Sequence, residues 1–133
     1  VADGLQPPFQ PSSFSGVLVD APCSGLGVLR RRPDARWRVR PDDVGRLAAL
    51  QQRLIGAAAP LVDRGGVLVY SVCTLTNAET VDVDDWARAE LGPDWEALAP
   101  PGPPWEPLGR GGLLLPQAAG TDGMYMLAVR RRP

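Results

Sequence analysis

Two short apolar runs, each ending near a polar residue, form the first pattern in the chain. They are GVLVD at residues 16–20 and GGVLVYSVC at residues 65–73. Both runs are continuous rather than alternating, which is typical of strands buried on both faces of a parallel sheet. We therefore predict two neighbouring parallel strands whose carboxyl ends meet at one edge of a sheet.

The segment between these runs has the spacing of a helix. Its apolar residues recur every three or four positions over residues 41–62, with a proline at the start and two glycines shortly after the end. The order strand, helix, strand predicts a right-handed crossover that places the two strands side by side. Cys23 and Cys73 follow the two strand ends, so we expect both thiols to face one crevice.

The rest of the chain predicts a second helix and a last strand. Residues 76–79, TNAE, have the spacing of a capping box, and the amphipathic pattern that follows ends at Gly92. Residues 94–98 predict a short strand, the Pro- and Gly-rich residues 99–112 a surface loop, and residues 124–130 a final apolar strand. These elements make an open α/β sheet, and in such sheets ligands bind outside the carboxyl ends of the strands.

Length and composition indicate one soluble domain. The chain has 133 residues and a hydrophobic fraction of 44%, and no apolar stretch approaches the roughly 20 residues that span a bilayer. The first residues lack the pattern of a signal peptide, and the missing initiator Met indicates a piece of a longer protein. Two cysteines and no histidine favour free thiols in the cytoplasm, with no disulfide framework, no metal site and no membrane partner.

Charge is distributed unevenly along the chain. The formal net charge is −1, which by itself gives no reason to expect a nucleic-acid partner. All 14 basic residues are arginine, however, and six of them lie between residues 30 and 40. Such a cluster is either a local phosphate-binding patch on an acidic protein or a solvated loop, and the arginine run alone leaves both interpretations open.

Four motifs are distributed along most of the length of the chain. They are DAPCSGLG at residues 20–27, RRRPDARWR at 30–38, YSVCTLTNAE at 70–79 and TDGMYMLAVRR at 121–131. Together they resemble the RNA 5-methylcytosine methyltransferases of the Sun/Nop2 family, also called NSUN or Fmu-like, and the bacterial 16S ribosomal RNA members most closely. The resemblance implies a class I S-adenosylmethionine-dependent methyltransferase fold, which is Rossmann-like, with RNA, in particular ribosomal RNA, as the substrate.

The resemblance also implies that this sequence holds only part of the family's catalytic domain. In the family, a glycine-rich loop after the first strand holds the cofactor S-adenosylmethionine, and the sequence contains no such loop. The family sheet has the strand order 3-2-1-4-5-7-6, of which this chain would supply 4-5-7-6 with an antiparallel final strand. Residues 1–133 would be the C-terminal half of the domain, inactive alone, and residues 17–20 would form an exposed edge through which the chain self-associates.

The resemblance assigns catalytic roles at the two strand ends. Carbon 5 of cytosine becomes nucleophilic enough for methylation only after a thiolate has added to carbon 6. The cysteine that matches Cys73 is the nucleophile in the family, and the one that matches Cys23 assists elimination and release of the product. Cys73 also comes just before the predicted helix start, where a thiolate is favoured. Asp20 would hydrogen-bond the polar edge of the cytosine, and its structural alternative is to cap the crossover loop.

The same resemblance implies contacts with cofactor and RNA. The positions near the cofactor are Asp3, Asp20 and Pro22. The side chains that would hold phosphates beside an unstacked target base are those of Arg30, Arg31, Arg32 and Arg36. Trp37 either stacks on a base or packs in the core, and core packing is the favoured interpretation. Glu79 matches an acid of the family, but a capping box explains it equally well, and it is therefore left out of the catalytic set.

Two other functions remain open at this point. An RNA-binding module that kept this fold without activity would also lack the glycine-rich loop. A dinucleotide-binding oxidoreductase is disfavoured because the sequence contains no GxGxxG motif.

Overall fold

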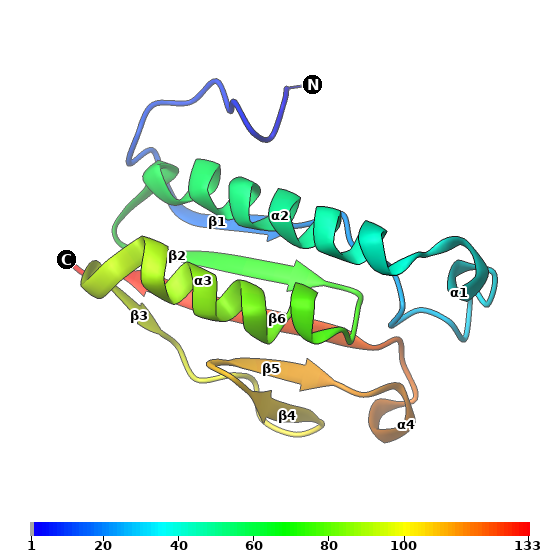
Figure 1. Ribbon diagram of the computed structural model, residues 1–133. Coiled ribbons are helices and arrows are strands. Elements are labelled where there is room, and N and C mark those ends of the chain that lie inside the picture. The colour runs from blue at the N-terminus through cyan, green and yellow to red at the C-terminus, as the bar shows by residue number, and fades with distance from the viewer. Residues whose placement is uncertain (1) are drawn as a thin grey trace.

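A six-stranded sheet forms the frame of the protein in the computed structural model, which describes residues 2–133 (Figure 1). The strands are β1 (Phe14–Asp20), β2 (Val62–Val72), β3 (Trp95–Ala97), β4 (Trp105–Leu108), β5 (Gly111–Leu114) and β6 (Met124–Arg131). The helices are α1 (Ala35–Arg38), α2 (Pro41–Ala58), α3 (Val81–Leu91) and α4 (Pro116–Ala119). Single 3-10 turns are η1 (Ala59–Leu61), η2 (Asn77–Glu79) and η3 (Gly92–Asp94). No helix within residues 2–133 is long and apolar enough to cross a membrane.

The strand order determines where a site can form. The sheet runs β1-β2-β6-β5-β4, and β3 also pairs with β6. β1 and β2 are parallel, whereas β6 is antiparallel to β2, β3 and β5. This arrangement confirms the predicted α/β sheet, and β1-β2-β6-β3 corresponds to the predicted 4-5-7-6 segment. Because α2 connects the parallel pair, the carboxyl ends of β1 and β2 meet at one edge, with Asp20 opposite Ser71.

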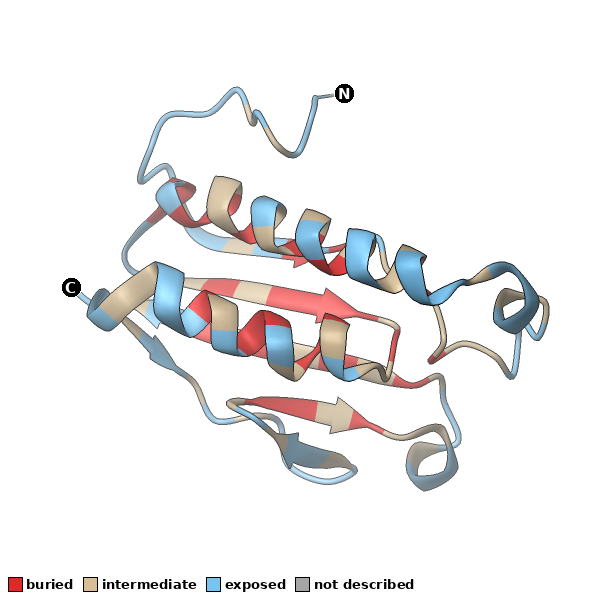
Figure 2. Ribbon diagram, viewed as in Figure 1, coloured by how far each residue is buried: buried red, intermediate tan, exposed pale blue. Residues whose placement is uncertain are grey.

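Only one face of the sheet is covered. Residues paired across neighbouring strands share a face, and one such row is buried beneath α2 and α3: Val19, Tyr70 and Leu127. The adjacent row lies on the opposite face and is only partly buried or exposed: Leu18, Val69 and Ala128. Figure 2 shows the buried residues concentrated under the two long helices. The predicted burial on both faces is therefore wrong for the described residues, because α2 and α3 lie on the same face.

The crossover helix ends earlier than the apolar spacing predicts. The pattern continues to Val62, but α2 ends at Ala58, and Val62 is the first residue of β2. Pro60 lies in the intervening 3-10 turn and has no backbone N–H with which to extend the helical ladder. The last apolar residues of the pattern therefore belong to a turn and a strand.

The predicted loop over residues 99–112 is wrong in its second half, which contains β4 and the start of β5. The two strands pair across a tight turn in which Gly109 has a φ of +59°, a conformation that glycine adopts without strain. The buried carboxylate of Asp84 in α3 fixes this turn. The backbone N–H of Arg110 donates to Asp84 Oδ2 at 2.7 Å, and Arg110 Nε donates to Oδ1 at 2.7 Å.

We expect the chain to self-associate through β1. This strand lies at the edge of the sheet and its Leu18 is 65% exposed, and unpaired backbone groups at such an edge pair with other strands. Sedimentation velocity should show concentration-dependent dimers or larger species. Leu18→Lys should restore the monomer, because a charge on an edge strand opposes pairing. A monodisperse wild-type monomer with residues 17–20 protected from hydrogen exchange would contradict this prediction.

Candidate active site

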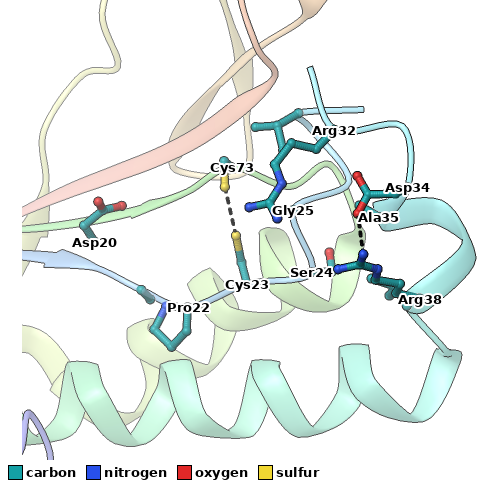
Figure 3. A pocket seen from close by; sticks show the side chains of 13 residues that line it. Asp20, Pro22, Cys23, Ser24, Gly25, Arg32, Asp34, Ala35, Arg38 and Cys73 are labelled. Carbon is teal, nitrogen blue, oxygen red and sulfur yellow. Dashed lines mark hydrogen bonds and ion pairs between the residues drawn. The ribbon is translucent and has the colours of Figure 1, made fainter. Parts of the chain in front are cut away.

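Two cysteines lie side by side just after the ends of β1 and β2 (Figure 3). Cys23 follows β1, Cys73 follows β2, and their sulfur atoms lie 3.2 Å apart although 50 residues separate them in the chain. Both thiols are free and half-buried. The prediction that they face one crevice is confirmed, and it follows from the parallel register of the two strands.

The two thiols line an open cavity of about 650 Å³. This volume is in the range of small-molecule sites in proteins. Its other lining side chains include those of Asp20, Pro22, Arg32 and Arg38. The cavity therefore places two nucleophilic groups between a carboxylate and guanidinium groups. Within residues 2–133, no cluster of three or more His, Cys, Asp or Glu side chains could hold a metal ion.

The environment of the Cys23 thiol favours its protonated form. Burial, followed by the hydrogen bond to Cys73, raises the pKa of Cys23 to about 12. Cys23 therefore keeps its proton at neutral pH and can donate a hydrogen bond to Cys73 Sγ.

The helix start predicted beside Cys73 is wrong, because α3 begins at Val81 after a separate 3-10 turn.

Hydrogen bonds to Glu79 connect the loop of Cys23 with the loop of Cys73. Its carboxylate is fully buried and accepts hydrogen bonds from the residues that directly follow each cysteine. Ser24 N–H donates to Oε1 at 2.8 Å, Ser24 Oγ donates to Oε2 at 2.6 Å, and Thr74 Oγ1 donates to Oε2 at 3.0 Å. The capping-box interpretation is wrong, because the Thr76 hydroxyl donates to Glu79 itself and neither side chain caps a helix.

Gln51 and Tyr70 extend this buried network. Gln51 Nε2 donates to the carbonyl of Pro22 at 3.0 Å and to Glu79 Oε1 at 3.1 Å. The Tyr70 hydroxyl donates to Gln51 Oε1 at 2.9 Å. The sequence contained a signal for this network, since Gln51 is a polar residue on the apolar side of the crossover helix. A fully buried amide needs partners, and here its partners are the loop of Cys23 and the carboxylate below it.

Asp20 lies at the end of β1, on the uncovered face of the sheet. Its Oδ1 accepts a hydrogen bond from Ser71 Oγ at 3.0 Å, which ties the two strand ends together. The carboxylate lines the cysteine cavity but is exposed, whereas the base-binding role that the resemblance implies for it requires a partly dry pocket. The difference arises because no described element covers this face of the sheet.

Two of the three residues predicted to contact a cofactor line the same cavities, and the third does not. Asp20 and Pro22 line both the cysteine cavity and a second cavity of about 360 Å³ along the outer side of β1. Leu18 and Leu54 make that second cavity largely apolar. Asp3 lines neither cavity, and its Oδ1 accepts the backbone N–H of Leu5 at 2.9 Å. Val1 lies outside the described residues.

The four arginines predicted to bind RNA have different environments. Arg31 forms an ion pair with Asp122, and Arg30 Nη1 donates to the carbonyl of Gly120 at 2.9 Å. These two side chains hold the loop that leads into β6. Arg32 lines the cysteine cavity, whereas Arg36 lies 4.6 Å from the centroid of the Trp37 ring. Arg32 is thus the one of the four that lines the thiol cavity.

Trp37 does not pack in the core. It is 79% exposed, so the favoured prediction of core packing is wrong. The physical reason is its position on α1, a four-residue helix that lies beyond the end of α2 and away from the sheet (Figure 1).

Gly27 brings three loops into contact below the cavity. Its N–H donates to the carbonyl of Cys73 at 3.0 Å, and its own carbonyl accepts the N–H of Gly123 at 2.8 Å. A Cβ at position 27 would lie 2.9 Å from the Cys73 carbonyl oxygen, closer than such contacts allow. Glycine is therefore required where the loop of Cys23 crosses the loop of Cys73.

Comparison with known proteins agrees with this arrangement. The model of the 16S rRNA methyltransferase RsmB/F family matches residues 1–130. The probable ribosomal RNA small subunit methyltransferase B of Bacillus subtilis is 42% identical over 130 residues, which are 93% of this chain and 29% of that protein. Ribosomal RNA small subunit methyltransferase B of Thermus thermophilus is 44% identical over 123 residues, which are 91% of this chain and 30% of that protein.

A solved structure is similar in fold as well as in sequence. The crystal structure of NSun6 from Pyrococcus horikoshii with SFG superposes with a TM-score of 0.69 at 29% identity, and the match covers 87% of this chain and 29% of that chain. This chain thus spans about three-tenths of the length of the curated relatives it matches. The match over residues 1–130 confirms the family resemblance of the four motifs, and the chain belongs to the RsmB/F family of 16S rRNA methyltransferases.

Proposed function

We propose that this chain carries the cysteine-bearing part of an RNA cytosine-C5 methyltransferase that modifies ribosomal RNA in the cytoplasm. The observation that carries the proposal is the pair of thiols 3.2 Å apart at the ends of two parallel strands. Residues 1–133 act as the C-terminal half of the catalytic domain. The names of the bacterial relatives support ribosomal RNA as the substrate.

The chemistry requires a nucleophile and a second group that handles a proton. The Cys73 thiolate adds to carbon 6 of cytosine, and the electrons of the C5–C6 double bond make carbon 5 nucleophilic. Carbon 5 then takes the methyl group and gives up its proton to water, the C5–C6 double bond re-forms, and the bond from carbon 6 to Cys73 breaks with its electron pair returning to the sulfur. The protonated Cys23 thiol lies 3.2 Å from Cys73 Sγ and donates a hydrogen bond to this sulfur as it departs, so it assists release of the product.

Asp20 and Arg32 orient the substrate in this proposal. The Asp20 carboxylate lines the same cavity as the thiols and accepts a hydrogen bond from the exocyclic amino group of cytosine. Arg32, on the cavity wall, holds a phosphate next to the target base, which must be unstacked to enter. Arg36 on α1 is a further phosphate contact in this proposal, as are Arg30 and Arg31 beside the loop that leads into β6.

S-adenosylmethionine supplies the methyl group as an electrophilic sulfonium substituent. The residues present fit one side of such a molecule: an exposed carboxylate at a strand end lies beside an apolar cavity along β1. Asp20 and Pro22 line this cavity and would contact the cofactor, and Asp3 is next to Gly4, which lines the same cavity. The remaining contacts come from the glycine-rich loop of the first half of the domain.

We expect the 133-residue chain alone to bind S-adenosylmethionine weakly or not at all and to methylate no RNA. Its sequence contains no glycine-rich cofactor loop, and its residues form one wall of the second cavity. Isothermal titration calorimetry measures the binding. A micromolar Kd for the isolated chain would show that most of the cofactor site lies within these residues.

The matched experiment uses a methyltransferase that contains these residues together with the cofactor-binding half. Incubation with methyl-labelled S-adenosylmethionine and small-subunit ribosomal RNA should place the label on carbon 5 of cytidine, as detected by nucleoside mass spectrometry. Label on another position would contradict cytosine-C5 chemistry. RNA binding without label would identify a non-catalytic RNA-binding module.

A further inference from the structure

Trp37 is a large exposed side chain with no packing role in the described structure. It is 79% exposed on a four-residue helix, and the Arg36 guanidinium lies 4.6 Å from its ring centroid. A guanidinium over one face of an indole restrains the ring and leaves the other face open to a planar ligand. The indole ring is therefore restrained by Arg36 but still exposed, so it can stack on a planar ligand.

The position of α1 relates Trp37 to the thiols. Ala35 and Arg38, which lie on either side of Trp37 in the same short helix, both line the cavity that contains Cys23 and Cys73. Trp37 does not itself line the cavity, but it is within two residues of both Ala35 and Arg38, on the short helix that borders the cavity. A ligand that enters the cavity and continues along the surface of α1 passes this ring.

The charges around Trp37 indicate the kind of ligand. Within the part of the chain that the structure describes, Arg30, Arg32 and Arg36 form no ion pair with a carboxylate. Their positive charge is therefore available to phosphates. An aromatic ring among unpaired arginines is the combination that binds single-stranded nucleic acid, in which each base offers a face and each linkage a negative charge.

We propose that Trp37, backed by Arg36, stacks on an unpaired RNA base that neighbours the target cytosine. This inference rests on the proposed function, because it assumes that RNA enters the cysteine cavity. Trp37 then determines which RNA segments bind well: those whose flanking base is unpaired and free to stack. A double-stranded flank would present no base face to the ring.

The test compares two strands that share a phosphate backbone. Fluorescence anisotropy measures binding of the 133-residue chain to a labelled, unstructured RNA 12-mer and to an abasic strand of equal length. Trp37→Ala should weaken binding to the 12-mer about tenfold, within the range of roughly 5- to 150-fold for loss of one base–aromatic stack. Trp37→Phe keeps a ring and should retain most of the affinity. The abasic strand should bind all three proteins equally.

Each other result has a distinct meaning. If Trp37→Ala binds the 12-mer as well as wild type, stacking is wrong, while the arginine contacts of the proposed function stand. If the variant weakens both strands equally, Trp37 acts on the phosphates through Arg36, and stacking is again wrong. If wild type binds neither strand, both the stacking and the RNA contacts of the proposed function are overturned. Protection of Trp37 from indole oxidation in an RNA-free, full-length methyltransferase would make its occupant a protein segment and overturn the proposal.

Discussion

Cys73→Ala is expected to abolish the covalent adduct with RNA, whereas Cys23→Ala is expected to make that adduct accumulate. The two thiols lie 3.2 Å apart, yet only the thiolate that adds to carbon 6 forms a bond to the base. Without Cys73 there is no nucleophile, although RNA still binds through the arginines. Without Cys23, attack and methyl transfer proceed, but elimination slows by about 10²- to 10⁴-fold, the usual effect of losing a positioned proton-transfer group.

Denaturing gel electrophoresis of the full-length methyltransferase with RNA and S-adenosylmethionine distinguishes the two variants. A protein–RNA species that survives denaturation should appear with Cys23→Ala and be missing with Cys73→Ala. The double variant is the control and should form none. An adduct with Cys73→Ala and none with Cys23→Ala would reverse the two roles. No adduct with either variant would favour the non-catalytic RNA-binding module.

Glu79→Ala is expected to destabilise the chain by roughly 3 kcal/mol, because it leaves several buried donors without an acceptor. These donors include Ser24 N–H, Ser24 Oγ and Thr74 Oγ1. Glu79→Gln is the matched control. Its amide oxygen can still accept from Ser24 N–H, and the hydroxyls can turn to accept from the amide NH₂, so the expected loss is about 1 kcal/mol. Urea unfolding measures both.

The position of the thiols gives a second readout for Glu79. A trivalent arsenical binds two neighbouring thiols at once, so wild type should take up one equivalent tightly. Glu79→Ala should bind it more weakly even under conditions where the chain is folded, because the loops of Cys23 and Cys73 are no longer tied together. Glu79→Gln should bind it as wild type does. Unchanged arsenical binding in a folded Glu79→Ala variant would show that the strands alone position the two sulfurs.

The pairing of the cysteines could be predicted from sequence because it depends on few rules. Two apolar runs joined by a helix form a right-handed crossover, and that topology puts the two following residues at one edge. Asp20 opposite Ser71 and the Sγ–Sγ distance of 3.2 Å are consequences of this register.

The role of Glu79 could not be predicted in the same way. The sequence Thr76–Glu79 fits a capping box, which is a local explanation, whereas its actual partner Ser24 is 55 residues away. Trp37 shows a related limit. The sequence around Trp37 does not indicate how far its side chain is buried. The prediction of core packing was wrong because α1 projects beyond the sheet. Burial on both strand faces failed because continuous apolar runs do not reveal which elements cover them.

The place of β6 in the sheet has a consequence for biosynthesis. β6 is translated after β2, β3 and β5, yet it pairs with all three and lies between β2 and β5. Until residues 124–131 leave the ribosome, β2 presents an open edge, and the apolar row of Tyr70 and Val72 lacks Leu127 and Tyr125 as neighbours. Nascent chains with such unpaired edges are prone to aggregate. Pairing with β6 thus closes this edge of β2 to other chains.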